Sequence, residues 1–245
     1  MTQVTKAVLC ACVLGLTAVS AASAQEPLHR AFLNANFGVQ ASSRDLDENA
    51  TFELYGETGT VEGTRQVGAG PLFDVSAGFK VWNNVFVGAG YSRFSDKGDV
   101  VLTARVPDPL HFDRPRAAEL TVADAAHTEQ AFHTQVLVSF ALGEKLDVMV
   151  GGGPSFYSLK QDVLDEVVAT EGSTLTVTGV TASLSESAVG FNITADLTYM
   201  VTERIGAGVL ARFSGAKIEM PAGEGVTRDV NVGGFQIGAG LRFRF

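Results

Sequence analysis

Along most of this chain, apolar residues recur at every second position in runs of about ten residues. This period is typical of a β-strand, because successive side chains of a strand point to opposite faces. The clearest run ends the chain, between Gly234 and Phe245, where the second face carries only Gly, Gln and Arg. Its apolar face consists of Phe235, Ile237, Ala239, Leu241, Phe243 and Phe245. The pattern predicts an amphipathic strand with one face against an apolar medium.

Further segments show the same alternation, which brings the predicted strands to eight. Their second face is dominated by Gly, Ser, Asn, Thr, Asp and Arg, which suits the narrow interior of an eight-stranded barrel. A soluble barrel or sandwich also alternates, but it turns its polar face outward. The sequence therefore predicts an all-β fold, an eight-stranded antiparallel up-and-down transmembrane β-barrel. The further segments are residues 30–40, 71–81, 85–94, 129–142, 146–158, 188–200 and 205–214.

The connections between these strands alternate in length. Tight turns are expected at residues 82–84, 143–145 and 202–204. Short turns at one end and long loops at the other are typical of outer-membrane barrels. An even strand count then places both termini on the short-turn, periplasmic side. The long loops are expected at residues 41–70, 95–128, 160–186 and 215–231.

The first residues have the pattern of an export signal. An apolar run follows Lys6, and Ala22-Ser23-Ala24 then has the small-x-small pattern that signal peptidase cuts, which predicts cleavage after Ala24. We expect residues 1–24 to be a signal peptide and residues 25–245 to be the barrel domain. A membrane anchor is the alternative, but the run is short for a bilayer span.

Both cysteines, Cys10 and Cys12, lie inside the predicted leader. The mature chain would then lack disulfides and thiolate chemistry, which suits passage through an oxidising periplasm. The formal net charge of -9 becomes -10 without Lys6. A chain this acidic does not suit nucleic acid as a partner.

The predicted long loops carry the net acidity, with 20 acidic and 9 basic residues. One interpretation is a solvated, repulsive surface. The other is bridging of divalent cations to lipid phosphates, because hard cations prefer carboxylate oxygens. Loop 95–128 also holds a cluster that would either contact a partner or pack over the barrel mouth. The cluster consists of Pro107, Pro109, Leu110, Phe112, Arg114, Pro115 and Arg116.

Strand parity also turns charged side chains of both signs into the lumen. Near balance of charge is what a packed interior requires, because an unpaired buried charge is costly. Heights along the strands predict the pairs Asp74–Arg212, Lys80–Asp147 and Asp196–Arg242. The sequence thus predicts a lumen closed by ion pairs. The inward charges are Arg30, Lys80, Arg212, Arg242 and Arg244 against Asp74, Glu129, Asp147 and Asp196.

Candidate catalytic groups are few. His133 lies in a strand, and its parity points it into the lumen beside Gln135, with no Ser and acid converging on it. Ser214 and Lys217 match an S-x-x-K motif without its companion motifs. No compact set of metal ligands is present in the sequence. We therefore assign no catalytic, cofactor-binding or metal-binding residues, expect no cofactor and expect no enzyme activity.

The chain resembles the bacterial outer-membrane β-barrel families around the OmpA transmembrane domain and OmpX. The resemblance rests on the leader, the eight strands, the terminal Phe245, and segments 73–82, 105–109, 112–116 and 153–156. Those segments are similar to uncharacterised outer-membrane barrels. The resemblance implies a Gram-negative outer-membrane location and recognition of the last strand by the assembly machinery. It implies no catalytic residues.

These observations favour a monomeric structural or surface-interaction protein in contact with outer-membrane lipid and lipopolysaccharide. A small-solute channel is one alternative, and it would need an open lumen. An enzyme that modifies outer-membrane lipid is the other, and it would need outward catalytic residues. Fold alone does not decide among these functions.

Overall fold

The computed structural model describes residues 29–41, 44–171, 175–221 and 227–245. The predicted signal peptide, residues 1–24, lies outside the described residues. Within the described ranges, no helix is long and apolar enough to cross a membrane. The strands are β1 (Ala31–Ala41), β2 (Arg44–Leu54), β3 (Glu57–Val67), β4 (Gly70–Trp82), β5 (Val85–Val106), β6 (Arg116–Ala141), β7 (Leu146–Glu171), β8 (Leu175–Met200), β9 (Ile205–Pro221) and β10 (Thr227–Arg244).

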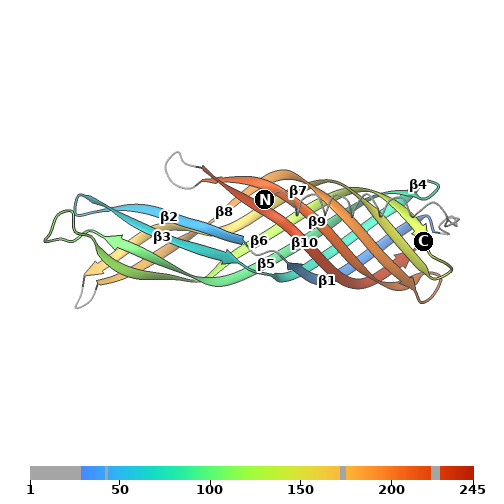
Figure 1. The fold of residues 1–245 in the computed structure, drawn as a ribbon, viewed down its shortest axis with the longest axis horizontal. Helices are drawn as coiled ribbons and strands as arrows, with labels where there is room; N and C mark the ends of the chain where they lie inside the picture. Colours follow the sequence, from blue (N-terminus) through green and yellow to red (C-terminus); the bar gives the residue numbers. More distant parts are fainter. Residues whose placement is uncertain (1–28, 42–43, 172–174, 222–226) are drawn as a thin grey trace, which may run out of the picture.

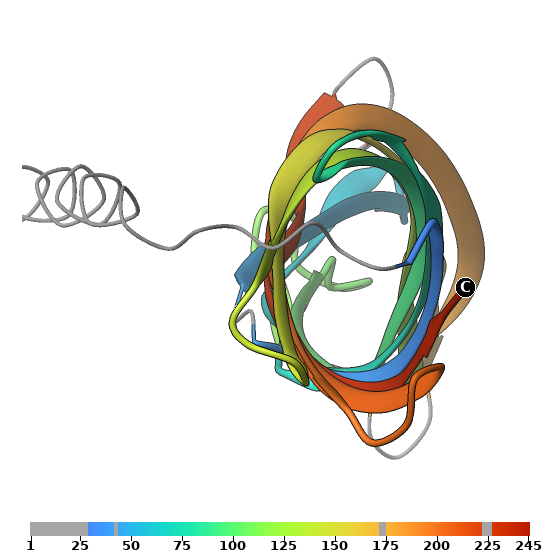
Figure 2. The same ribbon diagram turned by 90° about the vertical axis from the view of Figure 1, so that its right-hand side faces the viewer.

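Eight of these strands close into a ring. The order runs β1, β4, β5, β6, β7, β8, β9 and β10, and β10 pairs back with β1. All of these pairs are antiparallel, and Figure 2 shows the ring along its axis. The fold prediction is confirmed, as are the tight turns between β4 and β5, β6 and β7, and β8 and β9.

The remaining strands, β2 and β3, form an additional hairpin beyond the end of β1. Tyr55 and Gly56 make its turn, and both have positive φ angles, of 55° and 78°. This is the conformation that two-residue hairpin turns need, and glycine adopts it without a steric penalty. β3 pairs with β5 from Thr60 opposite Arg105 to Gly63 opposite Leu102. The hairpin therefore widens the sheet beyond the closed ring.

The prediction that the long connections are loops was wrong, because most of their described residues form β-strands. β5 to β8 continue far past the closed ring, as Figure 1 shows. The alternation inverts there, so that the inward face is apolar and the outward face is polar. Val100, Leu102 and Ala104 are buried, for example, whereas Thr103 and Arg105 are exposed. We call residues 44–67, 95–128, 160–190 and 215–231 the extension, of which 172–174 and 222–226 are outside the described residues.

Each strand of the ring carries one exposed aromatic side chain at the level where the extension begins. Several lie directly opposite one another in the register, such as Phe37 and Phe73, or Phe132 and Phe156. Aromatic girdles mark the boundaries of the apolar band of transmembrane barrels, which is about 25 Å tall. The aromatic belt consists of Phe37, Phe73, Tyr91, Phe132, Phe156, Phe191, Phe213 and Phe235.

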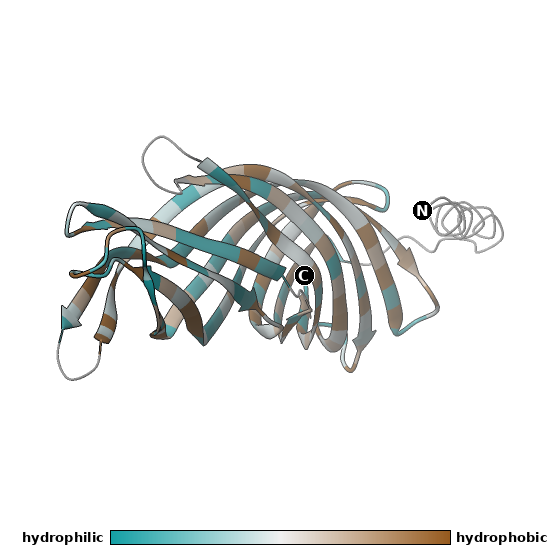
Figure 3. Ribbon diagram, turned by 60° about the vertical axis from the view of Figure 1, so that its left-hand side comes forward, coloured by the Kyte–Doolittle hydropathy of each residue, from teal (hydrophilic) through white to brown (hydrophobic). Residues whose placement is uncertain are grey.

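Between the aromatic belt and the short turns, the outer wall is apolar. Val136 and Ile193 are more than half exposed, with 54% and 59% of their surface accessible. Figure 3 shows more hydrophilic colour on the β2–β3 end than on the barrel wall. The faces are therefore as the sequence predicts, with apolar residues outward in the ring.

Candidate functional site

The interior of the ring is filled in layers. An apolar layer of Phe32, Phe86, Leu137 and Met149 lies toward the short turns. A polar layer follows, and a second apolar layer lies at the start of the extension. This mouth layer consists of Leu46, Val67, Leu72, Phe94, Ala131, Tyr157, Leu159, Ile218, Met220, Val230 and Val232. Polar groups are interleaved with the first apolar layer, because Ser139 lies opposite Met149, and Asp147 and Thr198 lie nearer the short turns.

Two of the predicted ion pairs are confirmed in the polar layer. Arg212 Nη1 lies 2.6 Å from Asp74 Oδ2, and both side chains are fully buried. Asn36 donates a further hydrogen bond to Asp74, at 3.0 Å. Arg242 binds Asp196 with two donors, at 3.0 and 2.7 Å. Charge-assisted pairs with this additional hydrogen bonding are the arrangement that offsets desolvation in a closed interior.

In the third predicted pair, Asp147 has a different partner from the predicted Lys80. Arg244 Nη2 lies 3.9 Å from Asp147 Oδ2, and Ser139 donates a 2.6 Å hydrogen bond to the same carboxylate. The pairing of Lys80 with Asp147 stays a prediction. Arg30 is exposed, so its predicted lumen position was wrong. It precedes the first residue of β1, where strand parity no longer applies.

Glu129 is neutralised by a residue that the sequence analysis missed. Arg44 Nη2 lies 2.9 Å from its carboxylate, and His127 Nε2 lies equally close. Gln40 and the Gly233 amide also donate to Glu129, at 3.0 and 2.8 Å. Arg44 begins β2, a strand without the outward apolar face by which the ring strands are predicted.

His133 lies in the lumen, as predicted, and is fully buried. Its ring nitrogens lie 2.9 Å from Ser92 Oγ and 2.7 Å from Ser155 Oγ. Ser214 is buried, whereas Lys217 is exposed and pairs with Asp229 at 2.5 Å. The S-x-x-K residues therefore point to opposite sides of the wall. His133 and Ser214 are both buried, so neither is exposed on the outer surface of the wall.

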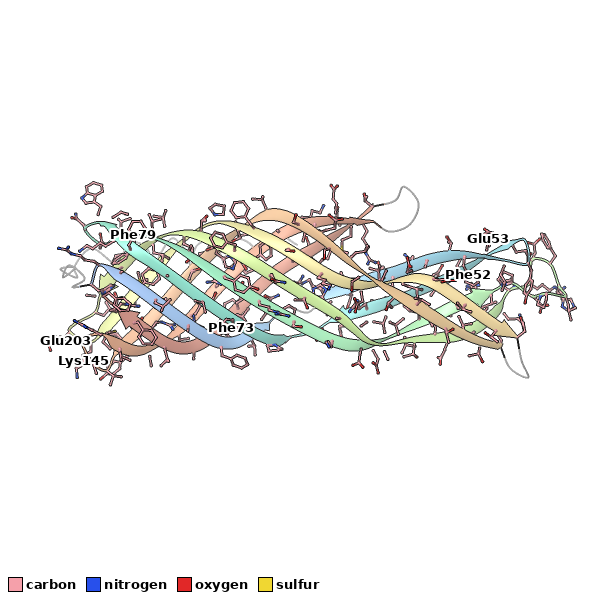
Figure 4. The ribbon with its side chains drawn as sticks, turned by 180° about the vertical axis from the view of Figure 1, so that it is seen from behind. Phe52, Glu53, Phe73, Phe79, Lys145 and Glu203 are labelled. Atoms are coloured by element: carbon pink, nitrogen blue, oxygen red, sulfur yellow. The ribbon has the colours of Figure 1, made fainter. Side chains whose placement is uncertain are left out.

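The loop between β5 and β6, residues 107–115, lies at the far end of the extension. Figure 4 places Glu53 at that end, and Lys145 and Glu203 at the other. Leu110 and Phe112 are 85% and 74% exposed. Of the two interpretations of this cluster, packing over the barrel mouth is wrong, because Leu110 and Phe112 are exposed and the loop lies at the far end of the extension.

Charged side chains brace this loop. Arg116 makes an ion pair with Glu171 of β7 and lies 3.7 Å from Asp108. Asp108 accepts a hydrogen bond from the Leu110 amide at 2.8 Å, which lowers the pKa of its carboxyl group. The hydrogen bond from Arg116 likewise lowers the pKa of Glu171. The Asp113 amide donates to Glu57 of β3 at 2.6 Å, so the loop is tied to neighbouring strands.

A polar concavity of about 450 Å³ lies on the outer face of the sheet near the hairpin. Its residues carry both signs of charge and no large apolar group, unlike most small-molecule sites. No group of His, Cys, Asp and Glu in the described ranges could hold a metal ion. The predicted binding of divalent cations stays a prediction. The concavity is lined by Asp47, Asn49, Glu62, Gly63, Thr64, Thr103 and Arg105.

Over residues 8–243 the sequence matches the model of a family described as the outer membrane protein beta-barrel domain. The chain belongs to this family. It is therefore a bacterial outer-membrane protein, and its ring of strands crosses that membrane. A search of curated proteins found no match.

Among solved structures, Neisserial surface protein A is similar, with 12% identity and a TM-score of 0.48, covering 88% of this chain and 97% of that one. Ail, the attachment invasion locus protein of Yersinia pestis, has 13% identity and a TM-score of 0.42, covering 88% and 99%. The outer membrane protease OmpT of Escherichia coli has 11% identity and a TM-score of 0.41, covering 87% and 97%. Identities this low show a shared fold alone.

Proposed function

We propose that this outer-membrane protein is a surface-interaction protein that contacts a partner protein through the loop at the far end of its extension. The observation that carries the proposal is the exposure of Leu110 and Phe112 on a loop held in place by ion pairs. Two large apolar side chains exposed side by side on one loop offer a contact surface, and a braced loop loses little entropy on binding. The acidic charge of the extension keeps such a surface soluble until the partner arrives.

The proposal places the extension outside the cell and the short turns in the periplasm. It is supported by the position of the C-terminus at the short-turn end, as in other barrels with long outer segments. We further propose a monomer that does not catalyse or transport. The filled lumen supports the absence of transport, and the burial of His133 supports the absence of catalysis.

Two membrane partners belong to the same proposal. Arg93 on β5 and Lys160 on β7 are exposed just beyond the aromatic belt, where phosphate groups of lipid and lipopolysaccharide would lie. The assembly machinery is the other partner, through the last strand and Phe245, whose side chain is 65% exposed on the lipid face.

The loop contact is tested with the double variant Leu110→Ser/Phe112→Ser. Purified protein in lipid nanodiscs is applied to an array of immobilised proteins, and the bound spots are compared. We expect the double variant to lose the spots that the wild type binds. The control is Val101→Ser, which removes an apolar side chain that is 57% exposed elsewhere on the extension. Identical binding by the double variant and the wild type would contradict the proposal.

A further inference from the structure

The longest unpaired strand edge of the extension belongs to β8. Toward β7, β8 is paired along its whole length, from Leu175 to Tyr199. Toward β9, its pairing stops at Phe191 opposite Gly215. Figure 1 shows β9 and β10 ending while β7 and β8 continue to the far end. Between Leu175 and Gly190, no described strand therefore pairs with this edge of β8.

The composition of this edge differs from that of a protected edge. Natural sheets guard free edges with charges, prolines or bulges, because open N–H and C=O groups recruit other strands. Other open edges carry several charges: they lie on β2, and on β6 and β7 beyond His127 and Gln161, where the pairing of these two strands ends. Arg228 of β10 also donates to the Asp47 carbonyl of β2. Residues 175–190 of β8 contain no proline, no basic residue and one acidic residue, Glu186. The β8 edge is thus open to backbone pairing.

The inward side chains along this edge are also incompletely covered. Leu184 and Ala188 pack against the mouth layer, yet both remain half-buried because no strand flanks them. Glu186 lies between them, opposite Leu159 of β7, and is likewise half-buried. Among the described residues, none forms a hydrogen bond or ion pair with the Glu186 carboxylate. An inward carboxylate on an open edge selects for a cation on the strand that would lie beside it.

A second copy of this chain does not fit this edge. Two copies in one membrane point the same way, so a twofold axis along the membrane normal gives their β8 strands opposite tilts. With tilts of about 35–45°, the two edges would cross at roughly 80°, and a ladder of hydrogen bonds could not form. The strand that pairs with this edge must therefore be free to align with β8. A segment of another polypeptide meets this condition.

We propose that the free edge of β8, residues 175–190, binds an extended segment of a partner protein as an added strand. Backbone hydrogen bonds to β8 supply affinity, as in other cases of strand addition. Apolar residues at alternate positions of the segment cover Leu184 and Ala188, and a Lys or Arg among them faces Glu186. This surface is separate from the loop at residues 107–115, so either contact can exist without the other.

The test uses a labelled peptide in which Thr alternates with Val and a central Val is replaced by Lys. A matched peptide carries Glu at that position. The full mature protein in lipid nanodiscs is titrated, and binding is followed by fluorescence anisotropy and by amide hydrogen exchange. We expect the Lys peptide to bind more tightly than the Glu peptide, by about fivefold, and to protect amides within residues 175–190.

Charge reversal at Glu186 tests whether the peptide binds at the edge of β8. Glu186→Lys should weaken the Lys peptide by a similar factor and favour the Glu peptide, while Glu186→Gln should remove the preference without reversing it. The control is Glu219→Lys, which makes the same charge change at an exposed position of β9 and should leave the preference intact. Absence of protection in β8, equal responses of the Glu186→Lys and Glu219→Lys proteins, or dimers formed through residues 175–190 would each overturn the proposal.

Discussion

At the scale of single residues, side-chain alternation explains which part of the lumen could be predicted. Parity and height along the strands were enough to pair Asp74 with Arg212 and Asp196 with Arg242, because a strand fixes both the direction and the level of each residue. Arg44 could not be found in this way, since its strand lies outside the apolar pattern. Arg30 could not be placed either, because it lies outside a strand.

The Asp74–Arg212 pair gives a prediction at this scale. Arg212→Ala leaves the Asp74 carboxylate buried without its cation, so we expect a loss of about 3–5 kcal/mol in the free energy of unfolding. Adding Asp74→Asn removes the stranded charge and should restore part of that loss. The measurement is urea unfolding in lipid vesicles, with both single variants and the double variant. Strictly additive losses would show that the two side chains are not coupled.

At the scale of elements, the strands of the ring were predictable and the extension was not. The strands of the ring have the outward apolar face that lipid requires, and this requirement ends at the aromatic belt. Beyond the belt, Leu102 and Ala104 face inward while Thr103 faces outward, as in a soluble sheet. The aromatic belt itself had a signal in the sequence, namely at least one aromatic residue on the apolar face of each predicted strand, but only the register shows that these residues form a ring.

The C-terminal strand gives a prediction at this scale. Phe245 closes the ring, because its amide donates to the Ala31 carbonyl at 2.9 Å and its carbonyl accepts from the Ala31 amide at 3.0 Å. Deleting Phe245 removes these bonds together with the proposed assembly signal. We expect much less heat-modifiable, folded protein in outer-membrane fractions, whereas Phe245→Tyr should assemble as well as the wild type. Equal amounts of folded protein after the deletion would contradict this prediction.

The braced loop gives a second prediction for an element. Because the pKa values of Asp108 and Glu171 are lowered in the fold, their contribution to stability is present above the ordinary pKa range and is lost as pH falls through the lowered values. We expect amide protection of residues 107–116 to be constant at neutral and mildly acidic pH and to drop once the pH falls below the ordinary pKa range of carboxyl groups. Glu171→Gln should reduce protection already at neutral pH. Equal protection of the loop at all these pH values would count against the brace.

At the scale of the whole molecule, the closed lumen gives the last prediction. Buried ion pairs and apolar side chains occupy the interior of the eight-stranded ring, which is only wide enough to hold side chains. Purified protein in planar bilayers should therefore show no stable conductance, with a sixteen-stranded porin as the positive control in the same bilayer. Well-resolved single-channel steps from the pure protein would contradict the closed lumen and would favour the channel.

The continuity of the ring with the extension has a mechanical consequence. β5 to β8 run without a break from the short turns to the far loop, so a partner that pulls on Phe112 would load these strands along their length. Ladder hydrogen bonds lie across the strands, and a lengthwise load must shear many of them together instead of opening them one by one. Under tension, the contact between the partner and the loop would therefore break before the barrel unfolds. The protein would then act as a rigid attachment point.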